Sequence, residues 1–142
     1  MVEVLNEQRI MTENSSTILK VLANNFPEFE KLVSVENNLI TIDKPSDTNA
    51  QIGGLVIQTT KDNEIWVRIY QPFSAYSVDN LEELLEIIKG VFADEILWVT
   101  AFNGMEWYET TLIQNIGQLE LEPGIVYNVF SWSGKLDKTV AG

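Results

Sequence analysis

The sequence predicts an α+β fold in which one antiparallel sheet of about six strands carries helices on one face. Two segments repeat apolar residues at helical spacing, and about six short segments show the alternation or the turn signals of strands. These segments follow one another in the order α-βββ-α-βββ. Consecutive strands joined by short turns pair antiparallel, and helices between groups of strands pack on the sheet that the strands form.

The length predicts one domain. The chain has 142 residues, of which 45% are hydrophobic, and this is enough for a real core. Residues 1–13 show no apolar period, so we expect a loose leader there and a single α+β domain over residues 14–142. No apolar run approaches the ~20 residues that span a bilayer. The first residues also lack the basic start and apolar stretch of a signal peptide, so we expect a cytoplasmic protein.

The first helix is expected to begin at Asn14-Ser15-Ser16, whose side-chain oxygens suit an N-cap. Pro27 should kink this helix or begin a second short one, because proline lacks the backbone N–H that a helix interior needs. The apolar residues at roughly helical spacing are Ile18, Leu19, Leu22, Phe26, Phe29 and Leu32.

Three strands are expected next. Residues 38–43 alternate, residues 44–51 form a polar loop, and residues 55–60 and 64–71 form a hairpin around Lys61-Asp62-Asn63. In the last strand Ile65, Val67 and Ile69 share one face, and Trp66, Arg68 and Tyr70 share the other.

A second helix is expected from Asp79, which together with Glu82 has the spacing of a capping box. Gly90 suits the end of this helix, because glycine readily adopts the left-handed conformation found there. The apolar stripe between them is Leu81, Leu84, Leu85 and Ile88.

The last three strands are expected at residues 95–102, 105–112 and 125–132. Asn103-Gly104 between the first two is a strong signal for a two-residue hairpin turn, which would pair Phe102 with Met105. One face then carries Ile96, Trp98, Phe102, Met105 and Trp107, and the other carries Leu97, Val99, Ala101, Tyr108 and Leu112. Either the N-terminal helix or another strand covers the second face, or that face binds a protein or a second copy of the chain.

Composition excludes several classes of function. The chain has no cysteine and no histidine, which removes disulfides, thiolate nucleophiles and imidazole metal ligands or bases. The net charge of −12 and the pI near 4.2 disfavour nucleic acids and anionic membranes, which require basic surfaces. Suitable partners are cations or basic proteins.

The acidic residues predict a site for a hard divalent cation, with Ca²⁺ as the preferred ion, because only oxygen ligands are abundant. Between residues 79 and 122 there are ten acids and one base, Lys89. No EF-hand loop is present, so the ligands would come from separate loops. The same residues also suit a solvated surface and ordinary turns. The candidate ligands are Glu36, Asp43, Asp47, Asp62, Glu64, Asp94 and Glu95.

The predicted topology divides these candidates between the two ends of the sheet. With three strands running up, down and up and the second helix returning down, Glu36, Asp62, Asn63, Glu64, Asp94 and Glu95 would meet at the lower end. Asp43, Asp47 and Asn49 would lie at the upper end, beside the N-terminus of the second helix. The positive helix dipole disfavours a metal there. The lower end is therefore the preferred cation site.

In its length, its acidic excess from Asp79 to Glu122 and its lack of an EF-hand loop, the chain resembles the small acidic non-EF-hand calcium-binding protein of heterocyst-forming cyanobacteria. The resemblance implies calcium sequestration or buffering in the cytoplasm. It is a resemblance of profile over the whole chain, so it assigns no individual binding residue.

Two hypotheses of function follow. The first is a cytosolic calcium-binding protein, a buffer or a sensor, that uses surface carboxylates from separate loops. The alternative is an acidic interaction module, such as an immunity protein, an inhibitor or a secretion chaperone, that holds a basic partner. We expect no enzyme, because the abundant carboxylates form no recognisable catalytic motif and the glycines Gly53 and Gly54 lack the lysine of a phosphate-binding loop.

Overall fold

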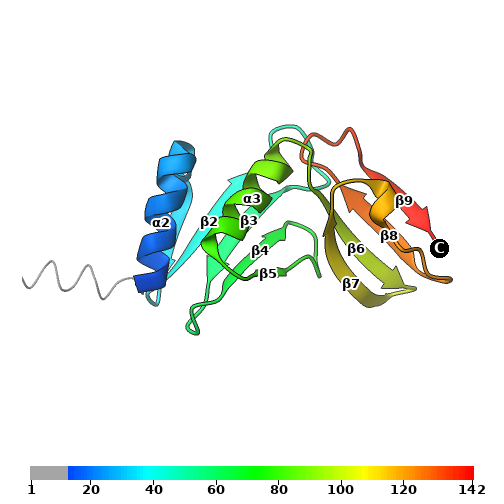
Figure 1. The fold of residues 1–142 in the computed structure, drawn as a ribbon, viewed down its shortest axis with the longest axis horizontal. Helices are drawn as coiled ribbons and strands as arrows, with labels where there is room; N and C mark the ends of the chain where they lie inside the picture. The colour runs from blue at the N-terminus through cyan, green and yellow to red at the C-terminus, as the bar shows by residue number, and fades with distance from the viewer. Residues whose placement is uncertain (1–12) are drawn as a thin grey trace, which may run out of the picture.

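The protein has a mixed α+β fold built on two antiparallel sheets (Figure 1). The computed structural model describes residues 13–142. Most of the predicted leader, residues 1–12, lies outside the described residues, while Glu13 begins the first helix. Within the described residues, neither α-helix is long and apolar enough to cross a membrane.

Two α-helices and two short 3₁₀ helices interrupt the strands. The helices are α2 (Glu13–Asn25), η1 (Pro27–Leu32), α3 (Leu81–Phe92) and η2 (Ile116–Gln118). The first sheet contains β1 (Val33–Glu36), β2 (Leu39–Pro45), β3 (Gly54–Thr59), β4 (Ile65–Ile69) and β5 (Tyr76–Val78). The second sheet contains β6 (Leu97–Asn103), β7 (Glu106–Ile113), β8 (Val126–Phe130) and β9 (Lys138–Ala141).

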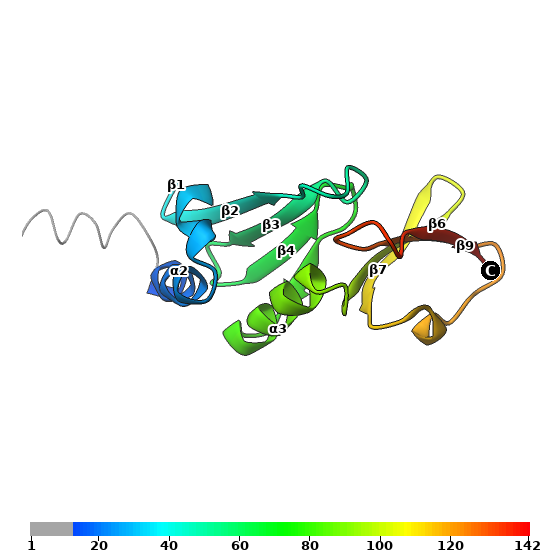
Figure 2. The same ribbon diagram turned by 90° about the horizontal axis from the view of Figure 1, so that it is seen from above.

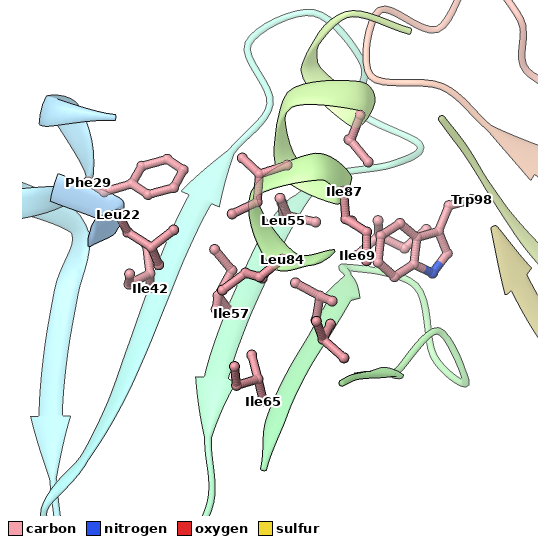
Figure 3. Packing of buried hydrophobic residues seen from close by; sticks show 14 of the residues in the cluster. Leu22, Phe29, Ile42, Leu55, Ile57, Ile65, Ile69, Leu84, Ile87 and Trp98 are labelled. Carbon is pink, nitrogen blue, oxygen red and sulfur yellow. The ribbon is translucent and has the colours of Figure 1, made fainter. Parts of the chain in front are cut away.

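The first sheet is a meander in the order β1-β2-β3-β4-β5, and α2 and α3 lie on one of its faces (Figure 2). The apolar stripe of each helix meets the inward side chains of the strands, such as Leu22 and Leu84 against Ile42 and Ile57 (Figure 3). The predicted division of β4 is confirmed, since Ile65, Val67 and Ile69 are all buried in this cluster.

The second sheet has the order β7-β6-β8-β9 and contributes to both hydrophobic clusters. One face, with Leu97, Val99 and Tyr127, forms a second, smaller cluster under the connection that contains η2. On the other face, Trp98 of β6 reaches into the main cluster beside Ile69 and Ile87 (Figure 3). The two sheets therefore share one large core, to which the second sheet contributes Trp98 of β6 and Phe130 of β8.

The prediction of a single six-stranded sheet is wrong: β1 and β5 were not predicted, and the tail, for which the sequence allows either a short strand or a frayed end, forms the strand β9. β1 follows directly on the apolar pattern of the first helix, so it resembled the end of that helix. β5 has three residues and β9 has four, which is too short for alternation to be recognised. With these strands the order becomes α-βββββ-α-ββββ, and the strands divide into sheets of five and four.

The predicted helix ends also shift. The first helix begins at Glu13, so Ser15 lies inside it and shares a hydrogen bond of 2.7 Å with the hydroxyl of Thr59. In α3 the N-cap is Asn80, whose side chain accepts from the backbone N–H of Glu83 at 2.8 Å. Asp79 therefore lies one residue before the cap. Pro27 begins a short helix as expected, here η1.

The β6–β7 turn is displaced by one residue from the prediction. Its central residues are Gly104 and Met105, so Phe102 pairs with Trp107 and Asn103 with Glu106. Only Gly104 has a positive φ, +63°, as expected for glycine at the first central position of a type II′ turn. A bulge between Ala101 and Phe102 then restores the register, so Thr100 pairs with Thr110.

Gly90 is buried within α3 instead of ending the helix, and we predict that Gly90→Ala destabilises the fold. A Cβ there would lie 2.5 Å from Cδ1 and Cγ1 of Ile96. Overpacking outweighs the helix propensity of alanine, so the free energy of unfolding should fall by about 1–2 kcal/mol in urea denaturation. Adding Ile96→Ala removes both contacting carbons and should make Gly90→Ala less harmful. Equal losses in both backgrounds would contradict this explanation.

Candidate protein-binding surface

The segment between β4 and β5, residues 70–75, packs on the second sheet at the end of the first. The indole N–H of Trp98 donates to the backbone oxygen of Ser74 at 2.8 Å, and both residues are buried. The hydroxyl of Ser74 accepts from the backbone N–H of Ile69 at 3.2 Å and lies 2.6 Å from the backbone oxygen of Gln71. These hydrogen bonds fix the conformation of the residue before Ser74, which is Phe73.

Phe73 projects outward onto the β6–β7 hairpin. Its φ of +58° is left-handed, a conformation that L-residues with large side chains rarely adopt. Its ring lies edge-on to Phe102, with centroids 6.0 Å apart, and stacks on Trp107 at 6.4 Å. Thr110 holds the arrangement, since its hydroxyl accepts from the indole N–H of Trp107 and donates to the backbone oxygen of Phe73. We call Phe73, Phe102 and Trp107 the aromatic cluster.

The aromatic cluster is largely open to solvent although its rings pack on one another. Phe73 is 59% exposed, Trp107 is 51% exposed, and Met105 at the tip of the same hairpin is 99% exposed. An isolated exposed apolar side chain needs no explanation, but adjoining exposed aromatic residues are typical of binding surfaces. The positive φ of Phe73 supports a binding role for the cluster, because the surrounding structure holds the backbone in an unfavourable conformation that leaves the ring outside the core.

The surroundings of the aromatic cluster are acidic. Glu106 and Glu109 lie exposed on β7, and no lysine or arginine occurs between residues 90 and 134. The phenol of Tyr108 donates to the carboxylate of Glu122, which holds the hairpin to the segment before β8. This hydrogen bond, with smaller contributions from burial and the Glu122 charge, raises the pKa of Tyr108 to about 12.

A second polar network joins the β2–β3 loop to the end of β8. The side-chain amide of Asn49 donates to the backbone oxygen of Ser131 at 2.7 Å and to the carboxylate of Asp137 at 2.8 Å. The other Asp137 oxygen accepts from the backbone N–H of Ser131 at 2.6 Å. A pocket of about 360 Å³ opens beside this network. Since both Asp137 oxygens are already hydrogen-bonded, we assign the network to joining the sheets.

The predicted grouping of acids at the lower end is wrong for Asp94 and Glu95. The missed strand β5 adds one reversal, so α3 runs upward and ends beside the β2–β3 loop. Asp94 there accepts from the backbone N–H of Ser133 at 3.0 Å, next to Trp132, whose backbone oxygen accepts from Thr48. The N-terminus of α3 is correspondingly at the lower end, not at the upper one.

The other candidate ligands are spread over the first sheet. Glu36 ends β1, while Asp62 and Glu64 lie in and after the β3–β4 turn, all three exposed at the lower end. Glu64 accepts from the indole N–H of Trp66 at 3.1 Å. Asp43 and Asp47 are exposed at the upper end, where Asp43 accepts from the phenol of Tyr70. Burial, followed by this hydrogen bond, raises the pKa of Tyr70 to about 12.

No group of three or more acidic side chains among residues 13–142 is close enough to hold a metal ion. Calcium binding by the predicted residues stays a prediction.

Sequence reasoning found part of the aromatic cluster and missed the rest. It placed Phe102 and Trp107 on one face of a hairpin, which the structure confirms. It missed Phe73, because the segment before β5 shows no periodic pattern and nothing local indicates that it packs on a strand about thirty residues later. It also missed the roles of Asn49 and Ser74, since serine and asparagine in loops are ordinary turn residues.

Comparison with known proteins returns no match: no family model, no curated protein and no solved structure is similar to the chain at a significant level.

We predict that Glu122→Gln lowers the pKa of Tyr108 from about 12 towards the usual value of 10, because the carboxylate is the main cause of the shift. A tyrosine pKa that is raised on folding stabilises the fold below pH about 10 and ceases to do so as pH rises through about 12. Ultraviolet titration of the tyrosines should show one group titrating earlier in the variant. Asp43→Asn is the matched control. It should lower the pKa of Tyr70 less completely, since burial is the larger cause there. An unchanged titration of Glu122→Gln would contradict the hydrogen bond.

Proposed function

We propose that the protein is an acidic binding module that holds a basic protein partner through the aromatic cluster of the second sheet. The observation that carries the proposal is the cluster itself. Three aromatic rings from two separate segments pack on one another at the surface, and Phe73 is held outward by a left-handed backbone conformation. The proposed activity is binding in the cytoplasm, without catalysis.

The chemistry of the cluster suits the centre of a protein interface. Aromatic residues, tryptophan above all, are enriched among the few side chains that supply most of the binding energy. The rings are already ordered by their mutual packing and by Thr110, so little conformational entropy is lost when a partner covers them.

The charge around the cluster selects the kind of partner. Glu106 and Glu109 flank Trp107 on the same strand, and Glu122 is held beside the hairpin by Tyr108. With a net charge of −12 and no base between residues 90 and 134, this surface attracts basic proteins and repels acidic ones. The attraction raises the association rate and weakens with added salt.

Calcium binding is the second candidate, and the direction of α3 gives it a different location. Asp94 and Glu95 lie at the same end of the first sheet as Asp43 and Asp47, but among residues 13–142 no three acidic side chains form a ready-made site. On this hypothesis, millimolar Ca²⁺ raises the melting temperature more than NaCl of equal ionic strength, because a bound ligand stabilises only the folded state. Asp47→Asn combined with Glu95→Gln should reduce the shift, and Glu82→Gln, at the other end of α3, should not. Unchanged melting and amide shifts with Ca²⁺ would contradict the hypothesis.

We predict that peptides selected from a displayed library of random twelve-residue sequences for binding to this protein are rich in lysine or arginine and contain apolar residues. Trp107→Ala should weaken their binding at least about 30-fold, the effect of losing a central interface residue. Trp66→Ala is the matched control. Trp66 is a half-buried tryptophan on the first sheet, on the face away from the helices, and its loss should leave the affinity unchanged.

The salt dependence and a charge variant complete the test. Glu106→Lys combined with Glu109→Lys should weaken binding by slowing association, and binding of the unaltered protein should fall as NaCl is raised. Selected peptides that are neutral or acidic, or that bind Trp107→Ala as tightly as the unaltered protein, would contradict the proposed function.

A further inference from the structure

β7 is an edge strand. It ends the order β7-β6-β8-β9, and β6 is the one element of the described residues that packs extensively on it. Among the described residues, the backbone hydrogen bonds outside regular pairing include none from β7. Every second residue of an antiparallel edge strand points its N–H and C=O away from its neighbour. β7 therefore presents unpaired backbone donors and acceptors along its outer side, which is the template that an added strand requires.

The two faces beside this edge differ in chemistry. Pairing with β6 places Trp107, Thr110 and Leu112 on the face of Phe102 and Trp98, next to Phe73. The same pairing places Glu106 and Glu109 on the opposite face, and both are exposed. Side chains of an added strand alternate between these faces. An extended segment with apolar residues on one side and basic residues on the other would meet a matching surface on each.

A bulge limits where such a strand can pair. Tyr108 is the extra residue opposite the irregularity between Ala101 and Phe102, whereas Glu109 to Ile113 pair regularly with β6. Bulges commonly protect edge strands from unwanted pairing. The regular stretch open to addition is therefore Glu109 to Ile113, and Trp107 lies just before it.

We propose that the basic partner binds as an extended segment that adds a fifth strand to the second sheet along Glu109–Ile113, with alternating apolar and basic side chains. The proposal rests on the proposed function and specifies how the partner is held. Backbone hydrogen bonds supply the pairing, the aromatic cluster anchors the apolar side chains, and Glu106 and Glu109 attract the basic ones.

The charges favour a foreign segment over a second copy of the chain. Two β7 strands paired edge to edge would place four carboxylates, Glu106 and Glu109 of each copy, along one pair of strands with no base between residues 90 and 134 to neutralise them. Repulsion between these charges opposes pairing of two copies. The other edge, β9, carries Lys138, and the aromatic residues of its neighbour β8, Tyr127 and Phe130, are buried, so it does not attract the same segment.

The test uses a pair of proline substitutions and the library peptides described above. Thr110 and Thr111 are neighbours, so one has its N–H directed to β6 and the other has it directed outward. Thr110→Pro and Thr111→Pro should therefore differ. The variant with the outward N–H should keep its melting temperature, since proline is tolerated on the open side of an edge strand. It should bind peptide at least tenfold more weakly than the threonine-to-valine variant at the same position, which also lacks the hydroxyl but keeps the backbone N–H. The other variant should lose stability.

Controls and a second measurement separate the possible outcomes. The matched controls are Thr139→Pro and Val140→Pro on the other edge strand, β9. One of these two variants should again keep its fold, and that variant should bind the peptide normally. In the unaltered protein, bound peptide should slow hydrogen exchange of alternate amides within Glu109–Ile113.

If binding depends on Trp107 but a folded β7 proline variant binds normally and exchange is unchanged, strand addition is wrong and the proposed function stands. If no peptide depends on Trp107, both fail. Sedimentation gives one more test. If the protein without peptide sediments as a dimer and the folded β7 proline variant sediments as a monomer, a second copy occupies the edge and the proposed strand addition is wrong.

Discussion

The burial of Trp98 is the interaction on which the rest of the structure depends. Trp98 belongs to a strand of the second sheet, yet its ring completes the core of the first, where it is 1% exposed. An indole buried at such a depth needs a hydrogen-bond acceptor, because an unpaired N–H costs about 1–3 kcal/mol. The backbone oxygen of Ser74 is that acceptor. Trp98 thus joins the two sheets, together with Phe130 of β8 in the same cluster, and its hydrogen bond fixes the position of the segment between β4 and β5.

The proposed binding surface follows from this junction. Phe73 precedes Ser74, so the hydrogen bond that satisfies Trp98 also places the ring of Phe73 on the β6–β7 hairpin. The Asn49 network fixes the opposite corner of the second sheet, where the β2–β3 loop meets the end of β8. The second sheet is held at these two separated points, and its β6–β7 hairpin is held in addition by the hydrogen bonds of Tyr108 to Glu122 and of Thr110 to Phe73. A rigid attachment with a projecting hairpin suits recognition, because the cluster is ordered before any partner arrives.

Local chemistry accounts for what could be predicted from the sequence. The period of α3, the alternation in β4 and the turn signal near Gly104 each depend on a few neighbouring residues, so these elements were recognised. The division into two sheets could not be predicted, since it depends on β5, a strand too short to show a period. That one strand reverses α3 and moves Asp94 and Glu95 to the other end of the sheet. The aromatic cluster could be predicted only in part, because local sequence shows which residues share a hairpin but not which distant segment packs on it. Phe102 and Trp107 share a hairpin, whereas Phe73 joins them only through the tertiary contact of Ser74 with Trp98.

The acidity of the second sheet opposes pairing of its exposed edge with a second copy of the chain. An open, regular and apolar edge strand normally invites pairing between copies. Here the bulge at Tyr108 shortens the regular stretch, and Glu106 and Glu109 oppose a second copy that carries the same charges. The carboxylates do not oppose a basic segment, because a basic segment neutralises them. In the proposed function, the same residues that oppose self-association select the partner, and discrimination between the two comes from the sign of the charge on the arriving strand.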